Sequence, residues 1–268
     1  MLQGERIPRR AADRGAHRRA DVVLSSAVTD ETSAGDVRAA LDALADPAAA
    51  AQLRRFFKTG PGEYGEGDEF VGLRVPQTRA VVRRFRALPI TEARALLDSP
   101  IHEHRLAGLL ILADRFARDR DARDRIVECY LDALNCGRVN NWDLVDSSAD
   151  RIVGEWVREH PDRAALLTEL VDDPDLWRRR TGLLATFACI KAGEAEPTLR
   201  LVARVLDDRR DLIQKAAGWM LREVGKRVDR ALLVSFLDVH AAAMGRTALS
   251  YATEHLEPAE RARLRALR

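Results

Sequence analysis

The chain has 268 residues, of which 46% are hydrophobic, 32% charged and 5% aromatic, and its formal net charge is +2. This length allows one or two domains with a sizeable core, and the apolar content excludes a disordered chain. No apolar run is long enough to span a membrane, and the amino-terminal arginines are not followed by the apolar stretch of a signal peptide. The cysteines, Cys129, Cys136 and Cys189, form no CxxC pair, which fits a reducing cytoplasm.

The amino-terminal segment differs from the rest of the chain. Residues 1–20 carry six arginines against Glu5 and Asp13, and their few apolar residues have no regular spacing. We therefore expect residues 1–34 to be a disordered basic tail and residues 35–268 to form a single domain.

From Asp36 onward, apolar side chains recur every three or four residues, as Ile126, Tyr130 and Leu134 illustrate. Good helix formers predominate, and alternating runs of β-branched residues are absent. Breaks between the helical segments fall at Gly60–Gly72, Pro89, Pro100, Cys136–Asn141, Pro161, Asp172–Pro174, Gly193–Pro197, Asp207–Asp211, Gly245 and Pro258. The sequence predicts an all-α fold of about twelve helices with about 10–20 residues each.

An internal repeat relates several of these helices. RLAGLLILA, which starts at Arg105, matches RRTGLLATF, which starts at Arg179, so Gly108 and Gly182 lie 74 positions apart. Gly218 follows Gly182 by 36 positions in a third apolar helix. A period near 37 residues predicts HEAT-like helical repeats in a curved superhelix, an α-solenoid whose inner helices line one concave surface.

Three predicted inner helices carry residues that are unusual in a packed helix. NNWDLVD places Trp142 and Asp146 on one helix face. LWRRR begins at residue 176, and QKAAGW ends at Trp219. Spacing alone leaves open that the tryptophans are core anchors and that the arginines form a solvated face. Residues 177–230 contain thirteen basic and seven acidic residues, a local charge of +6 that suits a polyanionic partner.

Five segments within residues 36–258 carry a family resemblance: FFKTGPGEYGEGDEFVGLRVP, HEHRLAGLLIL, VNNWDLVDSSADRIVG, LWRRRTGLLATF and LIQKAAGWMLREVGK. In order and spacing they resemble the AlkC/AlkD DNA glycosylase family of DNA alkylation repair enzymes, and its AlkD branch in particular. The resemblance implies a HEAT-like superhelix that grips duplex DNA on a basic concave face. It also implies hydrolysis of the N-glycosidic bond of cationic N3- and N7-alkylpurines in base excision repair. Bulky adducts are a further substrate class for such an enzyme.

The resemblance also assigns catalytic residues. The family's catalytic aspartate follows a tryptophan by four residues in a WDxVD pattern, which matches Asp146 and Trp142. A second cleft tryptophan in a QKAxGW pattern matches Trp219. A carboxylate in a partly desolvated cleft can stabilise an oxocarbenium ion and orient the attacking water, and we expect Asp146 to do both.

DNA-binding residues follow in the same way. The family's DNA-contacting arginine, three residues after a tryptophan, matches Arg180. We add two other basic residues, Arg179 and Lys215, as DNA-binding candidates. Nothing in the sequence singles out one of Lys191, Lys215 and Lys226 as a Schiff-base nucleophile, so we predict a monofunctional glycosylase without a lyase step.

We expect no cofactor and no metal. The expected partner is double-stranded DNA containing alkylated purines, without a membrane, bound by a monomer in the cytoplasm that associates with the nucleoid when it binds DNA. Two alternatives stay open: a non-catalytic HEAT-repeat DNA-binding protein and a protein-interaction scaffold. A steep salt dependence of DNA binding would distinguish the first from the second.

Two other motifs suit structural roles. GPGEYGEGD (60–68) lacks the Gly-Lys-Ser/Thr of a phosphate-binding loop, and its three acidic residues would repel phosphate. We predict a structured turn there. His102-Glu-His104 has no third metal ligand spaced nearby, so we predict that it opens a helix.

Overall fold

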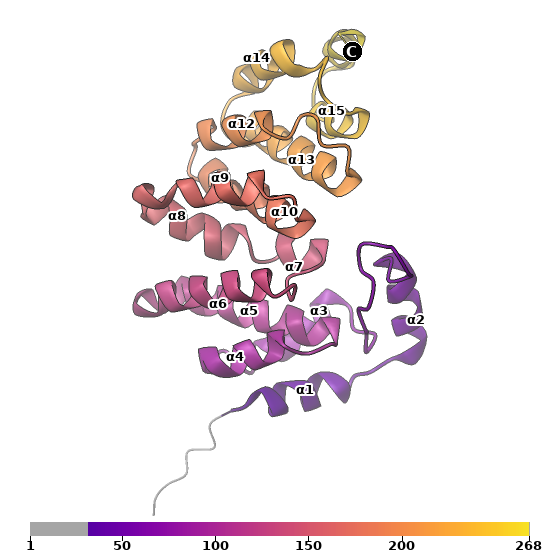
Figure 1. The fold of residues 1–268 in the computed structure, drawn as a ribbon, viewed down its shortest axis with the longest axis vertical. Coiled ribbons are helices and arrows are strands. Elements are labelled where there is room, and N and C mark those ends of the chain that lie inside the picture. Colours follow the sequence, from indigo (N-terminus) through magenta and orange to yellow (C-terminus); the bar gives the residue numbers. More distant parts are fainter. Residues whose placement is uncertain (1–31, 268) are drawn as a thin grey trace, which may run out of the picture. The chain divides into compact units, whose positions relative to one another are not determined.

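The computed structural model describes residues 32–267 of the chain (Figure 1). These residues form helices and no strand, which confirms the predicted all-α class. The predicted tail lies outside the described residues as far as residue 31. Ser33 and Asp36 cap the first helix reciprocally, and this helix begins at Ala34, one residue before the predicted domain boundary.

The helices follow one another through short connections, except that the loop 57–74 joins α2 to α3. Their bounds are α1 (Ala34–Asp42), α2 (Pro47–Phe56), α3 (Val75–Val82), α4 (Ile90–Leu97), α5 (His102–Arg118), α6 (Arg123–Asn135), α7 (Trp142–Asp146), α8 (Glu155–Glu159), α9 (Ala165–Asp172), α10 (Leu176–Ala185), α11 (Phe187–Lys191), α12 (Glu196–Ala203), α13 (Asp211–Arg227), α14 (Arg230–His240), α15 (Arg246–Ala252) and α16 (Pro258–Ala266). Only α2, α5, α6, α10, α13 and α14 reach the predicted length of ten residues. Thr186 shows why others are shorter: its hydroxyl donates to the Leu183 carbonyl at 2.7 Å, where α10 gives way to α11.

Helix pairs stack in succession within the described residues (Figure 1). Helix α5 packs on α4, α10 packs on α9, and α13 packs on α15. Helix α10 also contacts both α7 and α13. The three helices expected to carry the site are therefore neighbours, which gives the fold a solenoid-like arrangement.

Close helix approaches depend on the repeated glycines. A Cβ at Gly108 would lie 3.0 Å from the Ala93 carbonyl oxygen of α4, and one at Gly182 would lie 3.0 Å from the Leu167 carbonyl oxygen of α9. Both glycines thus pack on the preceding helix in the same way. Gly218 on α13 differs, because its Cβ would lie 2.4 Å from the Ala248 carbonyl oxygen of α15, a later helix.

The segment between the predicted breaks at Cys136–Asn141 and Pro161 is divided into three helical pieces. Helix α7 ends at Asp146, a π-helical stretch covers Asp150–Gly154, and α8 begins at Glu155. The Ser148 hydroxyl donates to the Leu144 carbonyl at 2.6 Å and so competes with the helical hydrogen bonds. The break leaves Asp146 at the carboxyl end of a short helix, and π-helical turns of this kind are frequent at functional sites.

Helix α2 and the loop 57–74 pack near the beginnings of α5 and α7. The rings of Phe57 and Phe70 stack 5.2 Å apart in a small apolar cluster that also contacts Trp142. Glu103 of α5 accepts hydrogen bonds from the backbone N–H groups of residues 71, 72 and 73 at 3.1, 2.8 and 3.0 Å. The segment His102-Glu-His104 therefore opens a helix, as predicted, and also holds this loop.

Candidate functional site

Asp146 and Arg180 lie at the centre of the candidate site. Nε of Arg180 donates to Oδ1 of Asp146 at 2.9 Å, and Nη2 donates to Oδ2 at 2.8 Å. Nη1 of Arg180 donates to the Leu212 carbonyl at 2.5 Å. One guanidinium group thus joins α7, α10 and the first turn of α13, and brings two predicted site residues into direct contact.

The environment of Asp146 combines burial with a fixed cation. Its side chain is 18% exposed, and that of Arg180 is 5% exposed. Burial raises the pKa of Asp146, Arg180 partly offsets the rise, and the carboxylates of Asp143 and Asp150 add to it. Such a partly desolvated carboxylate acts strongly on any positive charge that develops nearby.

A chain of buried charged groups fixes the beginning of α7. His102 contacts Oδ2 of Asp143 through Nε2 at 2.9 Å and Oδ2 of Asp68 through Nδ1 at 3.0 Å, and Nη2 of Arg105 donates to Oδ1 of Asp68 at 2.5 Å. Burial disfavours the charged imidazole, but Asp143 and Asp68 raise the pKa of His102 to about 9. His102 is therefore positively charged at neutral pH, and both of its ring N–H groups donate.

A cavity of about 420 Å³ opens beside Asp146. Its lining comes from α2, the loop 57–74, α7, α10, α13 and α15, and consists of Phe56, Lys58, Tyr64, Trp142, Asp146, Arg180, Leu212, Lys215, Trp219 and Tyr251. Five of the six residues predicted from the sequence meet here: Trp142, Asp146, Arg180, Lys215 and Trp219. The helices thus bring together residues that are widely separated in the chain.

Arg179, the sixth predicted residue, does not line this cavity. Its Nη1 donates to Oδ2 of Asp208 at 2.7 Å, and its Nε donates to the Asp173 carbonyl at 3.1 Å. Burial works against ionisation of Asp208, but Arg210 and Arg179 together lower the pKa of that carboxyl to about 2. Arg179 therefore ties the turn before α10 to the turn before α13.

The three tryptophans of α7, α10 and α13 divide into two kinds. Trp142 and Trp219 are half-buried and line the cavity, and Trp142 stacks on Phe57 with ring centroids 5.2 Å apart. Trp177 is only 8% exposed and belongs to the core. The core-anchor interpretation that spacing left open thus applies to Trp177, whereas Trp142 and Trp219 present ring surface to the cavity.

Five residues that border the same cavity were not predicted from the sequence: Leu212, Tyr251 and, from α2 and the loop after it, Phe56, Lys58 and Tyr64. Phe56 is 63% exposed, which is unusual for a large apolar side chain. Tyr64 lies in the glycine-rich loop, edge-on to Trp177 with ring centroids 5.9 Å apart. Burial raises the pKa of Tyr64, and a hydrogen bond with Trp142 opposes that rise. The sequence did offer one signal for Tyr64, because it is an aromatic residue in the middle of an otherwise glycine-rich and acidic turn.

Within residues 32–267, no group of three or more His, Cys, Asp or Glu side chains is arranged to hold a metal ion. No helix in that range is both long and apolar enough to cross a bilayer.

Lys215 donates to Asp211 at 2.8 Å, and this hydrogen bond raises the pKa of the ammonium group, which therefore stays charged.

Fold and site together define a class of protein. It is an all-α protein with a solenoid-like stack of helices, in which a carboxylate–guanidinium pair, two tryptophans and two lysines border one cavity. Residues 37–256 match the family described as DNA alkylation repair enzyme, and the chain belongs to this family. Membership supports a role in the repair of alkylated DNA.

The fold comparison agrees with this assignment. A solved structure described as a predicted DNA alkylation repair enzyme from Enterococcus faecalis is 17% identical, with a TM-score of 0.65. The alignment covers 80% of this chain and 97% of that chain, so the similarity shows a shared fold. No curated protein matches the sequence.

Proposed function

We propose that this protein is a monofunctional DNA glycosylase that hydrolyses the N-glycosidic bond of cationic N3- and N7-alkylated purines in duplex DNA, as a step of base excision repair. It would act without a cofactor, as a monomer, on chromosomal DNA in the cytoplasm. The observation that carries the proposal is the carboxylate of Asp146, partly buried and held at two points by Arg180, in a cavity bordered by Trp142 and Trp219.

The chemistry needs one well-placed carboxylate. An alkylated purine with a formal positive charge leaves with the electron pair of the C1′–N bond and becomes neutral, so a general acid is dispensable. Positive charge then develops on the deoxyribose, where Asp146 stabilises it electrostatically. Water attacks C1′ and loses its proton to the Asp146 carboxylate, which acts as general base.

Aromatic and basic side chains account for binding. The ring faces of Trp142 and Trp219 attract a cationic nucleotide, with ~0.5–2 kcal/mol for each contact. Lys58 and Lys215 border the cavity and attract phosphates. Arg180 has one N–H left on each Nη atom after its contacts with Asp146 and Leu212, and these can donate to a phosphate oxygen.

A lyase step does not fit Lys215 or Lys191. A Schiff base needs a neutral amine, which enzymes obtain by lowering the lysine pKa. The hydrogen bond with Asp211 raises the pKa of Lys215 instead. Lys191 ion-pairs with Asp150 and does not border the cavity. We therefore expect abasic DNA as the product, with the strand intact.

The test is release of free methylpurines from methylated duplex DNA, read by chromatography. Three proteins are compared: the wild type, Asp146→Asn and Asp150→Asn. Asp150→Asn makes the same change four residues further along, at a side chain that pairs with Lys191 outside the cavity. We expect release by the wild type and Asp150→Asn, and more than about 100-fold slower release by Asp146→Asn at unchanged DNA affinity. Equal activity of Asp146→Asn would overturn the mechanism.

A salt titration separates the two non-catalytic alternatives if no protein releases base. For several phosphate contacts, the logarithm of the affinity falls linearly with the logarithm of the salt concentration, by about 0.9 for each contact. A DNA-binding protein without catalysis would keep this slope. A protein-interaction scaffold would show almost none.

A further inference from the structure

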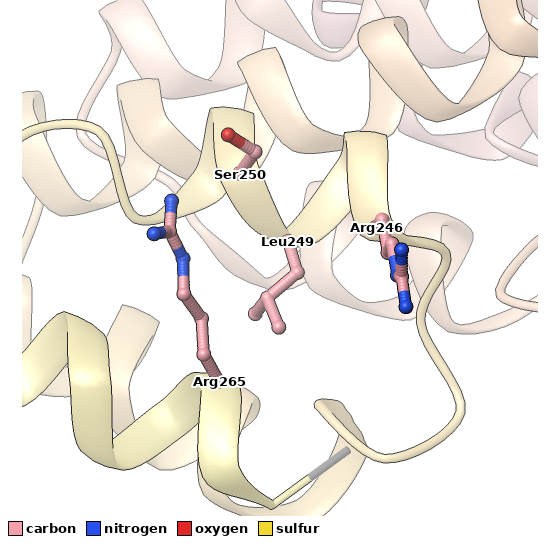
Figure 2. Close-up of a pocket in the computed structure, with 4 residues that line it drawn as sticks. All are labelled: Arg246, Leu249, Ser250 and Arg265. Atoms are coloured by element: carbon pink, nitrogen blue, oxygen red, sulfur yellow. The ribbon is translucent and has the colours of Figure 1, made fainter.

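A second cavity, of about 400 Å³, lies between α15 and α16, away from Asp146. It is lined by Arg246, Leu249, Ser250 and Arg265. Figure 2 shows Arg246 at the beginning of α15 and Arg265 on α16, on opposite sides of Leu249, with Ser250 on the same side as Arg265. Two cations thus flank an apolar floor that has a hydroxyl group at one edge.

These two arginines are distinguished by the absence of partners. Among the described residues from 211 to 267, the other arginines all donate to carboxylates or carbonyls: Arg222 to Glu254, Arg227 to Glu223, Arg230 to Glu260, Arg261 to the carbonyls of Glu254 and Leu256, and Arg263 to Asp238. Within that range Arg246 and Arg265 make no hydrogen bond or ion pair, and both are exposed. Two like charges around one cavity favour an anionic ligand.

Helix α15 contributes residues both to this cavity and to the candidate site. Tyr251, the residue after Ser250, borders the cavity that contains Asp146. Helix α15 packs on α13, which carries Lys215 and Trp219. A nucleic-acid strand that leaves the candidate site past Lys215 and Tyr251 therefore already lies against α15, the helix that carries Arg246 and Ser250.

We propose that the cavity between α15 and α16 is a second binding site for the DNA backbone, distant from the lesion. Neighbouring phosphates of one strand bind Arg246 and Arg265, Ser250 donates to a phosphate oxygen, and the intervening sugar lies on Leu249. A single small anion would need donors that converge on one point. Separated guanidinium groups on either side of an apolar floor suit a polymer with repeated phosphates. The inference rests on the proposed function in one respect, that duplex DNA is the substrate.

The first experiment measures duplex affinity by fluorescence anisotropy over a range of salt concentrations, with the full chain. The test protein carries Arg246→Gln and Arg265→Gln. The matched control carries Arg230→Gln and Arg263→Gln, which remove two arginines that are already paired with acids. We expect the salt slope of the test protein to fall by about 2, close to 1 for each lost phosphate contact, and that of the control to stay at the wild-type value.

The second experiment locates the contact on the DNA. Duplexes are shortened stepwise on one side of a central lesion and then on the other. Wild type should lose affinity abruptly on one side only, and the test protein should be insensitive to shortening on that side. Base release at saturating DNA should be unchanged, because neither arginine borders the cavity of Asp146.

Two results would overturn the proposal. One is a test protein with the wild-type salt slope and the wild-type dependence on duplex length. The other is calorimetric binding of inorganic phosphate that the test protein loses while its duplex affinity is unchanged, since this would mean a site for a small anion. Failure of the proposed glycosylase is a separate outcome: wild type would then release no base, while the slope and length effects would still identify the backbone site.

Discussion

Asp146 and Arg180, which are 34 positions apart, form a two-point salt bridge with N–O distances of 2.9 and 2.8 Å. Paired hydrogen bonds of this geometry fix the orientation of a carboxylate as well as its charge. The same guanidinium donates to the Leu212 carbonyl, so the orientation of Asp146 depends on the packing of three helices. Arg180 is thus a positioning residue for Asp146 in addition to a candidate DNA contact.

Removal of Arg180 should change the pH dependence of base release. Burial already raises the pKa of Asp146, and Arg180 is the group that holds it down. Without that cation the pKa of Asp146 should rise further, so the acid limb of the profile should move to higher pH. Arg180→Ala should also weaken duplex binding at every sequence, because a phosphate contact carries no sequence information.

The measurement is single-turnover base release between about pH 5 and pH 9 for the wild type, Arg180→Lys and Arg180→Ala. Arg180→Lys should give an intermediate profile, since it keeps a charge and loses the two-point geometry. Arg178→Ala serves as the control because Arg178 pairs with Asp173 and does not border the cavity. Identical acid limbs for the wild type and Arg180→Ala would refute the link between the two side chains.

His102 should make the free energy of unfolding depend on pH. Its pKa is raised from 6.5 to about 9 in the folded protein, so folding favours the charged form. A raised pKa gives a stabilisation that is complete below about pH 6.5, declines as the pH approaches about 9, and is lost above it. The shift corresponds to a contribution on the order of 3 kcal/mol.

Urea unfolding of the wild type and His102→Gln at about pH 6 and about pH 10 tests this. At the lower pH the variant should be less stable, because Asp68 and Asp143 lose the cation between them. At the higher pH, the difference in free energy of unfolding between the wild type and His102→Gln should shrink by most of the contribution that the charged His102 makes. His255→Gln, at an exposed histidine, should show no such change. A difference that is constant with pH would mean that His102 is neutral in the folded protein.

The fold class follows from local sequence, but the helix ends do not. Spacing of three and four residues reports which face of a segment is apolar, and this suffices for the all-α class and for the repeat that contains Gly108 and Gly182. Ser148 and Thr186 divide predicted helices because their hydroxyls bond to carbonyls four and three residues earlier. Serine and threonine in helices commonly point elsewhere, so composition does not identify these breaks.

Likewise, the motifs identified most of the candidate site but not its internal contacts. WDxVD and QKAxGW depend on residue type and spacing, which the sequence gives directly. The Asp146–Arg180 pair depends on how α7 and α10 rotate against each other, and the separation of Arg179 from Arg180 depends on the same rotation. Tyr64 enters the site through a loop that turns at Gly62 and Gly67, with φ of 75° and 84°, and no periodicity describes such a path.

Gly154 should be intolerant of a methyl group, although alanine normally favours a helix. A Cβ at Gly154 would lie 2.2 Å from the Ala185 carbonyl oxygen and 2.9 Å from the Ala188 Cβ, so the backbone of the α10–α11 junction would have to move. We expect Gly154→Ala to destabilise the protein by about 1–3 kcal/mol, more than the ~1 kcal/mol that alanine contributes in a helix. Gly35→Ala is the matched control, because its Cβ would make an ordinary contact of 3.4 Å with the Ser33 hydroxyl.

Urea unfolding and base release, measured on the same samples, complete this test. Gly35→Ala should be as stable as the wild type or slightly more stable, with wild-type base release. Gly154→Ala should lose stability, and its base release should fall as well under conditions where it is still fully folded, because the junction it displaces adjoins the helix that carries Arg180. Wild-type stability of Gly154→Ala would mean that α10 and α11 can shift without cost. The close contact between Gly154 and the α10–α11 junction would then have no role in positioning Arg180 against Asp146.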